Sequence, residues 1–311
     1  MAAPARIAFV FPGQGSQRVG MGDELLTRRP WLFERRFAAA EAASGLPLRR
    51  LVRHGPPEAL TPTEVAQPAL FALSLALADD ARAEGIRPAF VAGHSLGEYA
   101  AAVVAGALSA DDGVRLVAER GRLMAEAQTR RPGAMAAVVG LPADRVRALC
   151  DAAGGVCVAN HNTPTQVVVS GDRAAIEELA ERGRESGGRV VPLDVGAAFH
   201  SPAMAPVRHR LDAVTRQMRW ADPEVPLAAN VSGRLLTQGE DVRRALVAQV
   251  AAEVQWVRCV ATLRRAGATT FLELGARPVL SGLIRAIDPA ATVLGNTHAA
   301  AALSEPARAV A

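Results

Sequence analysis

The sequence has no lysine, so all 35 of its basic residues are arginine. The arginines are spread along the whole chain, the formal net charge is only +4, and no basic run is interleaved with aromatic residues. This pattern argues against a nucleic-acid partner, which would need a concentrated basic patch. Because arginine binds phosphate and carboxylate groups through a planar fork of donors, a phosphorylated cofactor or an acidic protein partner fits better.

Cysteine is also scarce. Cys150, Cys157 and Cys259 are an odd number of residues and show no C-x-x-C spacing. These features argue against a disulfide framework and against a zinc site, so we expect no metal. Unpaired thiols are typical of a reducing compartment, and we therefore expect a cytoplasmic protein.

Long apolar runs are absent as well. No segment approaches the ~20 apolar residues that span a bilayer. The N-terminus lacks the charged region, apolar core and cleavage site of a secretory signal. We expect a soluble monomer without membrane association.

The most informative stretch that is present is Gly93-His94-Ser95-Leu96-Gly97. It follows a short apolar strand, predicted at Ala89–Ala92, and precedes a helix predicted from Leu96 to Ala105. G-x-S-x-G between a strand and a helix is the pattern of a nucleophile elbow, in which a tight turn exposes the serine. The helix N-terminus beside the serine supplies amide donors for a developing oxyanion. The alternative is a buried strand that ends in a chance Gly-x-Ser-x-Gly turn.

The order of predicted elements indicates an α/β fold with an insertion. Strands at Arg6–Phe11, Leu227–Val231 and Thr270–Leu274 alternate with helices, which predicts a largely parallel sheet. Between Pro132-Gly133 and Gly196 the order changes to β-α-β-β-α-β, which is that of a ferredoxin-like unit. We therefore predict a large subdomain formed by residues 1–130 and 199–311, with a small subdomain, 131–198, inserted into it.

Arg120 departs from the charged face of its helix, which is predicted at Asp111–Thr129. Its helical neighbours are Leu116 and Leu123, so its side chain is expected on the apolar side. A buried arginine is costly unless it is paired. It either meets a carboxylate of this protein or awaits one from a ligand.

A serine nucleophile needs a general base, and six histidines compete for that role. His94 adjoins Ser95, but side chains at adjacent positions diverge, so a packing or orienting role is expected. His200 lies where the insertion rejoins the main subdomain, and a hinge between lobes is where a cleft forms. We prefer His200, with His161 as the alternative. No aspartate stands out as a third member, so a backbone carbonyl is a candidate to orient the imidazole.

Seven motifs give the chain a close resemblance to the malonyl-CoA:acyl-carrier-protein transacylases, the acyltransferases of fatty-acid and polyketide synthesis. The likeness runs over about residues 6 to 298. The motifs are Phe11–Gln17, Gly93–Tyr99, Glu119–Gly121, Gly133–Ala137, Asn162–Val167, Phe199–Ser201 and Val254–Trp256. The resemblance implies an α/β-hydrolase-like body with a ferredoxin-like insertion.

The resemblance also implies a role for each matching site residue. Ser95 would be the nucleophile and His200 the base, with the backbone carbonyl of Gln255 holding the other imidazole nitrogen. The backbone amides of Gln14 and Leu96 would form the oxyanion hole.

Arg120, by the same resemblance, would bind the free carboxylate of a malonyl group. Phe199 and His94 would line the substrate pocket, and Leu96 with Phe199-His200 follows a pattern that goes with malonyl rather than methylmalonyl donors. Ala197, Ala252-Glu253 and Ala276-Arg277-Pro278 depart from common family residues and bear on the extender unit and the carrier-protein surface.

The activity that follows is a ping-pong transfer of malonyl from malonyl-CoA to the phosphopantetheine thiol of an acyl carrier protein, without a cofactor. The rivals are an acyl hydrolase acting on carrier proteins, an acyltransferase with another extender unit, and a non-catalytic docking module. Arg120 favours the transferase over a hydrolase of uncharged chains. The sequence does not separate fatty-acid from polyketide synthesis.

Overall fold

The computed structural model describes residues 5–295, and its strands form two separate sheets. The larger sheet has the order β10-β9-β1-β2-β7-β8. All its neighbouring strands are parallel except β7 and β8, which are antiparallel. The α/β class predicted from the sequence is confirmed. The strands are β1 (Ile7–Phe11), β2 (Phe90–Gly93), β7 (Leu227–Ala228), β8 (Leu235–Leu236), β9 (Thr270–Glu273) and β10 (Thr292–Gly295).

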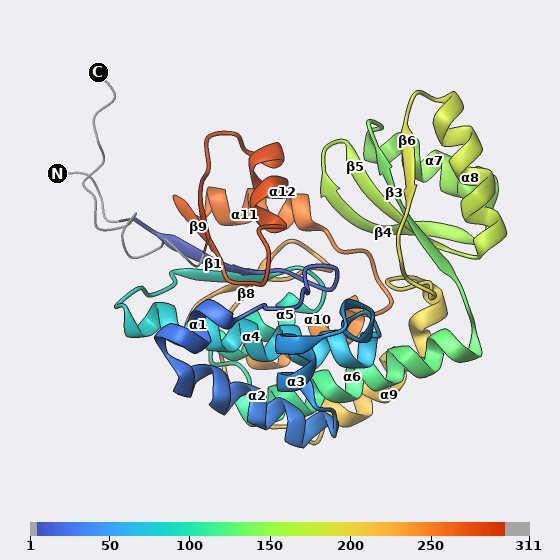
Figure 1. The fold of residues 1–311 in the computed structure, drawn as a ribbon. Helices are drawn as coiled ribbons and strands as arrows, with labels where there is room; N and C mark the ends of the chain where they lie inside the picture. The colour runs from blue at the N-terminus through green and yellow to red at the C-terminus, as the bar shows by residue number, and fades with distance from the viewer. Residues whose placement is uncertain (1–4, 296–311) are drawn as a thin grey trace.

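Helices cover both faces of the larger sheet, because alternate strand residues are apolar on both sides. In β1, Phe9 and Phe11 face the larger core cluster, whereas Ala8 and Val10 face a second cluster. The first face carries α1 (Asp23–Arg28), α2 (Pro30–Ser44), α3 (Leu48–His54), α4 (Thr63–Ala83), α5 (Gly97–Val104), α6 (Ala110–Arg130), α9 (Ala205–Thr215) and α10 (Gly239–Gln249) (Figure 1). The second face carries α11 (Trp256–Arg265) and α12 (Leu280–Ile287).

Several of these elements were not predicted from the sequence, notably α1, α2, α3, β8 and β10. The helix predicted at about Ala203–Met218 is divided into a 3₁₀ turn, Pro202–Met204, and α9. None of the helices within residues 5–295 has the length and hydropathy needed to cross a membrane. The sequence after His298 is expected to be a frayed tail, and it lies outside the described residues.

The smaller sheet has the order β4-β5-β3-β6, and all its strand pairs are antiparallel. It stands at one end of the body in Figure 1, drawn from green to yellow. Its chain order is the predicted β-α-β-β-α-β. The elements are β3 (Ala134–Val139), α7 (Ala143–Ala153), β4 (Val156–Thr163), β5 (Gln166–Gly171), α8 (Arg173–Glu185) and β6 (Arg189–Pro192).

The small sheet is attached to the body through the segment between α10 and α11. The amide of Val254 donates to the carbonyl of Ala159 in β4 at 2.8 Å, and the amide of His161 donates to the carbonyl of Val254 at 2.9 Å. Beside them, Arg147 of α7 forms a two-pronged ion pair with Glu253, each N–O distance being 2.8 Å. These contacts therefore fix the position of the small sheet relative to the body on this side.

The turn from β2 to α5 is so tight that two glycines are required. A Cβ atom on Gly97 would lie 1.9 Å from the carbonyl oxygen of Phe11 in β1, and one on Gly93 would lie 1.9 Å from the carbonyl carbon of Gly97. Because backbone atoms rather than flexible side chains occupy these positions, a methyl group cannot be accommodated without moving β1 or α5.

We predict that Gly97→Ala lowers the free energy of unfolding by about 1–3 kcal/mol, as overpacking a rigid site does. The matched control is Gly282→Ala in α12, where an added Cβ meets no atom within 4 Å. That variant should gain up to about 1 kcal/mol from helix propensity. Urea denaturation of the two variants and the parent measures the difference. Equal midpoints for Gly97→Ala and the parent would contradict the packing argument.

Candidate active site

Ser95 and His200 have the unusual backbone conformation that marks many functional positions. Among the non-glycine residues within 5–295, only these two have a positive φ, 51° for Ser95 and 55° for His200. The left-handed conformation costs of order 1–3 kcal/mol in such residues and persists only where the surroundings enforce it. Ser95 follows β2 directly, and His200 lies between β6 and the 3₁₀ turn at Pro202–Met204.

The two side chains are in direct contact. Ser95 Oγ lies 2.7 Å from His200 Nε2, and His200 Nδ1 lies 2.7 Å from the backbone carbonyl oxygen of Gln249. A carbonyl can only accept, so Nδ1 carries the hydrogen and the lone pair of Nε2 faces the serine hydroxyl. Burial, and then the nearby charge of Arg120, lower the pKa of His200 to about 3. The imidazole is therefore a neutral base at physiological pH.

Gln255, expected to orient His200 through its carbonyl, does not do so. The Gln255 carbonyl accepts the Cys259 amide at 3.0 Å as the first hydrogen bond of α11. The residue that contacts His200 is Gln249, at the C-terminal end of α10, where the last carbonyls lack the usual helical partner. In the structure, the backbone carbonyl that contacts His200 Nδ1 is therefore that of Gln249 rather than that of Gln255.

Gln14 and Leu96, the predicted oxyanion-hole residues, line the same cavity as Ser95. Leu96 stands at the start of α5. Within the described residues, neither backbone amide donates a hydrogen bond to a protein acceptor. The Gln14 side chain is held in place, because its Oε1 accepts from Thr63 Oγ1 at 2.8 Å. Two free amides in one cavity suit an oxyanion, and this role remains a prediction.

Arg120 is buried beside the serine, with 1% of its surface exposed. Its guanidinium donates to Gln67 Oε1 at 2.6 Å, to Ser95 Oγ at 3.2 Å and to Gln249 Oε1 at 3.3 Å. Its Nε has no acceptor. Across residues 5–295, no carboxylate lies within ion-pair distance of it. Of the two alternatives left by the sequence, internal pairing with a carboxylate is therefore not what the structure contains.

The cavity that joins these groups measures about 320 Å³ and lies between the two sheets. Phe199 and His94 are among the residues that line it, whereas the alternative base His161 is not. His94 Nε2 lies 2.8 Å from Oδ1 of Asn162, a residue of β4. The apolar part of the wall consists of Leu96, Met124, Met135, Leu193, Val195 and Phe199.

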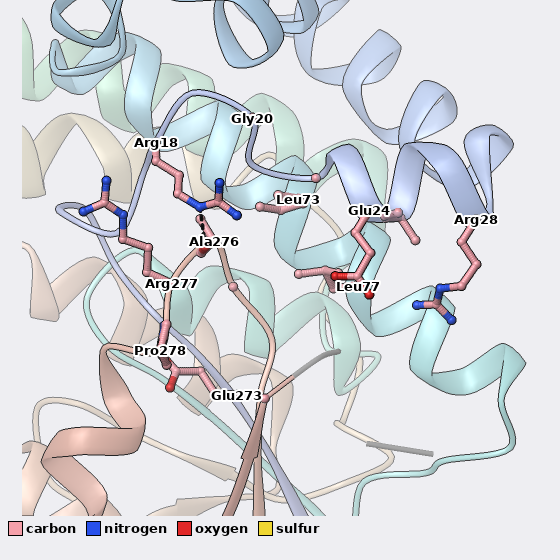
Figure 2. A pocket seen from close by; sticks show the side chains of 14 residues that line it. Arg18, Gly20, Glu24, Arg28, Leu73, Leu77, Glu273, Ala276, Arg277 and Pro278 are labelled. Carbon is pink, nitrogen blue, oxygen red and sulfur yellow. Dashed lines mark hydrogen bonds between the residues drawn. The ribbon is translucent and has the colours of Figure 1, made fainter. Parts of the chain in front are cut away.

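A second cavity, of about 250 Å³, lies at the carboxyl ends of β9 and β10 and contains none of the predicted site residues. Figure 2 shows Arg18 donating through Nε to the carbonyl of Ala276, with Arg277 and Pro278 alongside. The Ala276-Arg277-Pro278 segment therefore lines this separate cavity and not the one that contains Ser95.

Sequence reasoning missed two residues that hold the site together, Gln249 and Asn230. Gln249 Nε2 donates to the Ser95 carbonyl at 2.8 Å and to Glu98 Oε2 at 2.9 Å. Asn230, after β7, bonds to both sides of the elbow. No motif predicts either residue, because an amide side chain that hydrogen-bonds to backbone groups requires no characteristic sequence spacing.

Comparisons with known proteins agree on one family. Residues 8–303 match the family model described as an acyl transferase domain. The malonyl CoA-acyl carrier protein transacylase of Bacillus subtilis is 40% identical over 289 residues, 91% of each chain. The crystal structure of the Xanthomonas oryzae transacylase has a TM-score of 0.90 at 41% identity, covering 94% of this chain and 95% of that one.

A further solved structure contains a type II polyketide synthase acyl carrier protein in complex with its malonyl-transacylase. It is 35% identical, with a TM-score of 0.90, and covers 94% of this chain and 96% of that one.

Because its pKa is lowered, His200 should remain a neutral base well below pH 6.5. A histidine with the ordinary pKa of 6.5 loses about three-quarters of its basic form on going from pH 8 to pH 6. Because His200 has its pKa lowered to about 3, the rate at which a fluorophosphonate labels Ser95 should stay nearly constant over that interval. Removing the positive charge in Arg120→Ala should raise the pKa of His200 and so move the acidic limb of the pH profile to higher pH. A parent rate that halves near pH 6.5 would contradict the assignment.

Proposed function

The chain belongs to the acyl transferase family, among the malonyl CoA-acyl carrier protein transacylases, and on this premise we propose how its residues carry malonyl from coenzyme A to an acyl carrier protein. The observation that supports the proposal most directly is that one Ser95 Oγ contacts both a neutral imidazole and an unpaired guanidinium. These are the base and the carboxylate anchor that a malonyl transfer requires.

In the first half-reaction, Ser95 Oγ attacks the thioester carbonyl of malonyl-CoA and transfers its proton to His200 Nε2. The amides of Gln14 and Leu96 stabilise the oxyanion. The C–S bond then breaks, and the departing sulfur takes the proton from His200. A malonyl ester remains on Ser95, with its free carboxylate bound to Arg120.

In the second half-reaction, the phosphopantetheine thiol of the carrier protein enters the same cavity. His200 takes the thiol proton as the sulfur attacks the ester carbonyl. The Ser95 oxygen leaves and recovers that proton. The CoA sulfur leaves with the proton of Ser95, and the proton of the carrier thiol replaces it, so Ser95 and His200 both return to their starting states. We also propose a cytoplasmic location, which the three free thiols support.

We propose malonyl as the extender unit. Leu96 and Phe199 are 2% and 6% exposed and both line the cavity. A methyl group on the α-carbon would have to displace one of them. One methyl is worth about 1–3 kcal/mol of discrimination in such a pocket, so methylmalonyl should be disfavoured rather than excluded.

Intact-protein mass spectrometry tests the transfer. Brief mixing with malonyl-CoA should add one malonyl group, which should be absent in Ser95→Ala and should move to a phosphopantetheinylated carrier protein. Decay of the adduct to free malonate, with the carrier protein untouched, would instead support the hydrolase. An adduct formed only by a bulkier donor would overturn the choice of extender unit.

We predict that Arg120→Ala lowers the rate of malonyl loading about 10- to 100-fold, the value of a charged hydrogen bond, and leaves acetyl loading from acetyl-CoA undiminished. The matched control is Arg122→Ala on the same helix, because Arg122 is half exposed and paired with Glu119 and Glu126. Competition between the two donors, read by mass, measures the ratio. An unchanged malonyl-to-acetyl ratio in Arg120→Ala would remove its role as anchor.

A further inference from the structure

Asn230 lies under the nucleophile turn and is fully buried. It follows β7, the strand next to β2 in the sheet. Its Oδ1 accepts the backbone amide of Ser95 at 2.8 Å, and its Nδ2 donates to the carbonyl of Gly93 at 2.7 Å. One side chain thus joins the last residue of the strand to the strained serine.

The backbone of Asn230 is equally constrained. Its amide donates to Glu98 Oε1 at 2.9 Å, and its carbonyl accepts the amide of Gln255 at 2.8 Å. The residue therefore cannot shift without breaking bonds to both α5 and the start of α11. A rigid group that holds two points of a turn fixes the φ of the residue between or beside them.

We propose that Asn230 is a positioning residue that holds Ser95 in its left-handed conformation and so keeps Ser95 Oγ within reach of His200 Nε2. The role goes beyond filling the core, because both ends of the amide meet backbone groups of the turn itself. The inference rests on the proposed role of Ser95 as nucleophile.

The side-chain amide has a specific chemical requirement here. The Ser95 amide needs an acceptor and the Gly93 carbonyl needs a donor, and only a carboxamide of this length supplies both from one planar group. Asn230→Asp keeps the acceptor and, in its ionised form, loses the donor, whereas Asn230→Ala loses both. The two variants therefore separate the effect of losing one hydrogen bond from the effect of losing both.

The experiment measures the rate at which a fluorophosphonate labels Ser95, by intact mass, together with kcat and KM for malonyl-CoA. Misplacing a reacting group by about 1 Å can cost on the order of 10²-fold in rate. We expect Asn230→Ala to be labelled about that much more slowly, with Asn230→Asp intermediate. KM should stay within about two-fold, since the anchor for the malonyl carboxylate is untouched.

Thr215→Val is the matched control for the loss of buried hydrogen bonds. Thr215 is 1% exposed, donates to the Asp212 carbonyl and accepts from Arg243, away from the cavity. It should lose stability and keep the parent labelling rate. If folded Asn230→Ala is labelled at the parent rate, the proposal is overturned.

If Asn230→Ala does not fold, Asn230→Asp decides in its place, and a parent labelling rate in that variant likewise overturns the proposal. A parent enzyme that is labelled normally but never loads malonyl would refute the proposed function and leave the role of Asn230 intact.

Discussion

A buried guanidinium without an ion-pair partner is the constraint on which the rest of the site depends. Arg120 is 1% exposed and meets only neutral acceptors within residues 5–295, together with the Tyr99 ring, whose centroid lies 5.0 Å from Cζ of Arg120. Desolvating a charge in this way is costly unless other groups compensate for it. The surrounding polar groups compensate for this cost only in part and do not neutralise the cation, which is the state that the proposed binding of a malonyl carboxylate requires.

Glu98 illustrates how that compensation is limited. This carboxyl group is fully buried, and burial raises its pKa to about 7 against the lowering effects of Asn230, Gln249 and Arg120. It does not touch Arg120, because the Gln249 side chain lies between them, with Nε2 on Glu98 and Oε1 on Arg120. A direct ion pair would hold the guanidinium away from the cavity. The intervening amide keeps the two groups apart, so Arg120 has no carboxylate partner within residues 5–295.

The side chains of Ser95, His200 and Arg120 are easier to predict from the sequence than the groups that hold them in place, for a physical reason. Ser95 is predicted by the flanking glycines, which only a tight turn needs. His200 and Arg120 are predicted because burying an imidazole or a guanidinium costs free energy unless the group has a partner or a role. His200 depends on a carbonyl, and every residue has one, so the family likeness pointed to Gln255 although Gln249 is in place. Helices α1 to α3 were missed because they are short or weakly amphipathic and gain stability from packing rather than from pattern.

The segment from Gln249 to Val254 couples the base to the spacing of the two sheets. At one end its carbonyl holds His200, and at the other Val254 pairs with β4, with the Glu253–Arg147 ion pair beside it. The small sheet supplies Met135 and Asn160 to the cavity, and the body supplies Ser95 and Arg120. A shift of the small sheet would therefore pull on the segment that orients the imidazole. The width of the cavity and the orientation of the imidazole are therefore linked through these six residues, and the ion pair between Glu253 and Arg147 ties the segment to α7 of the small subdomain.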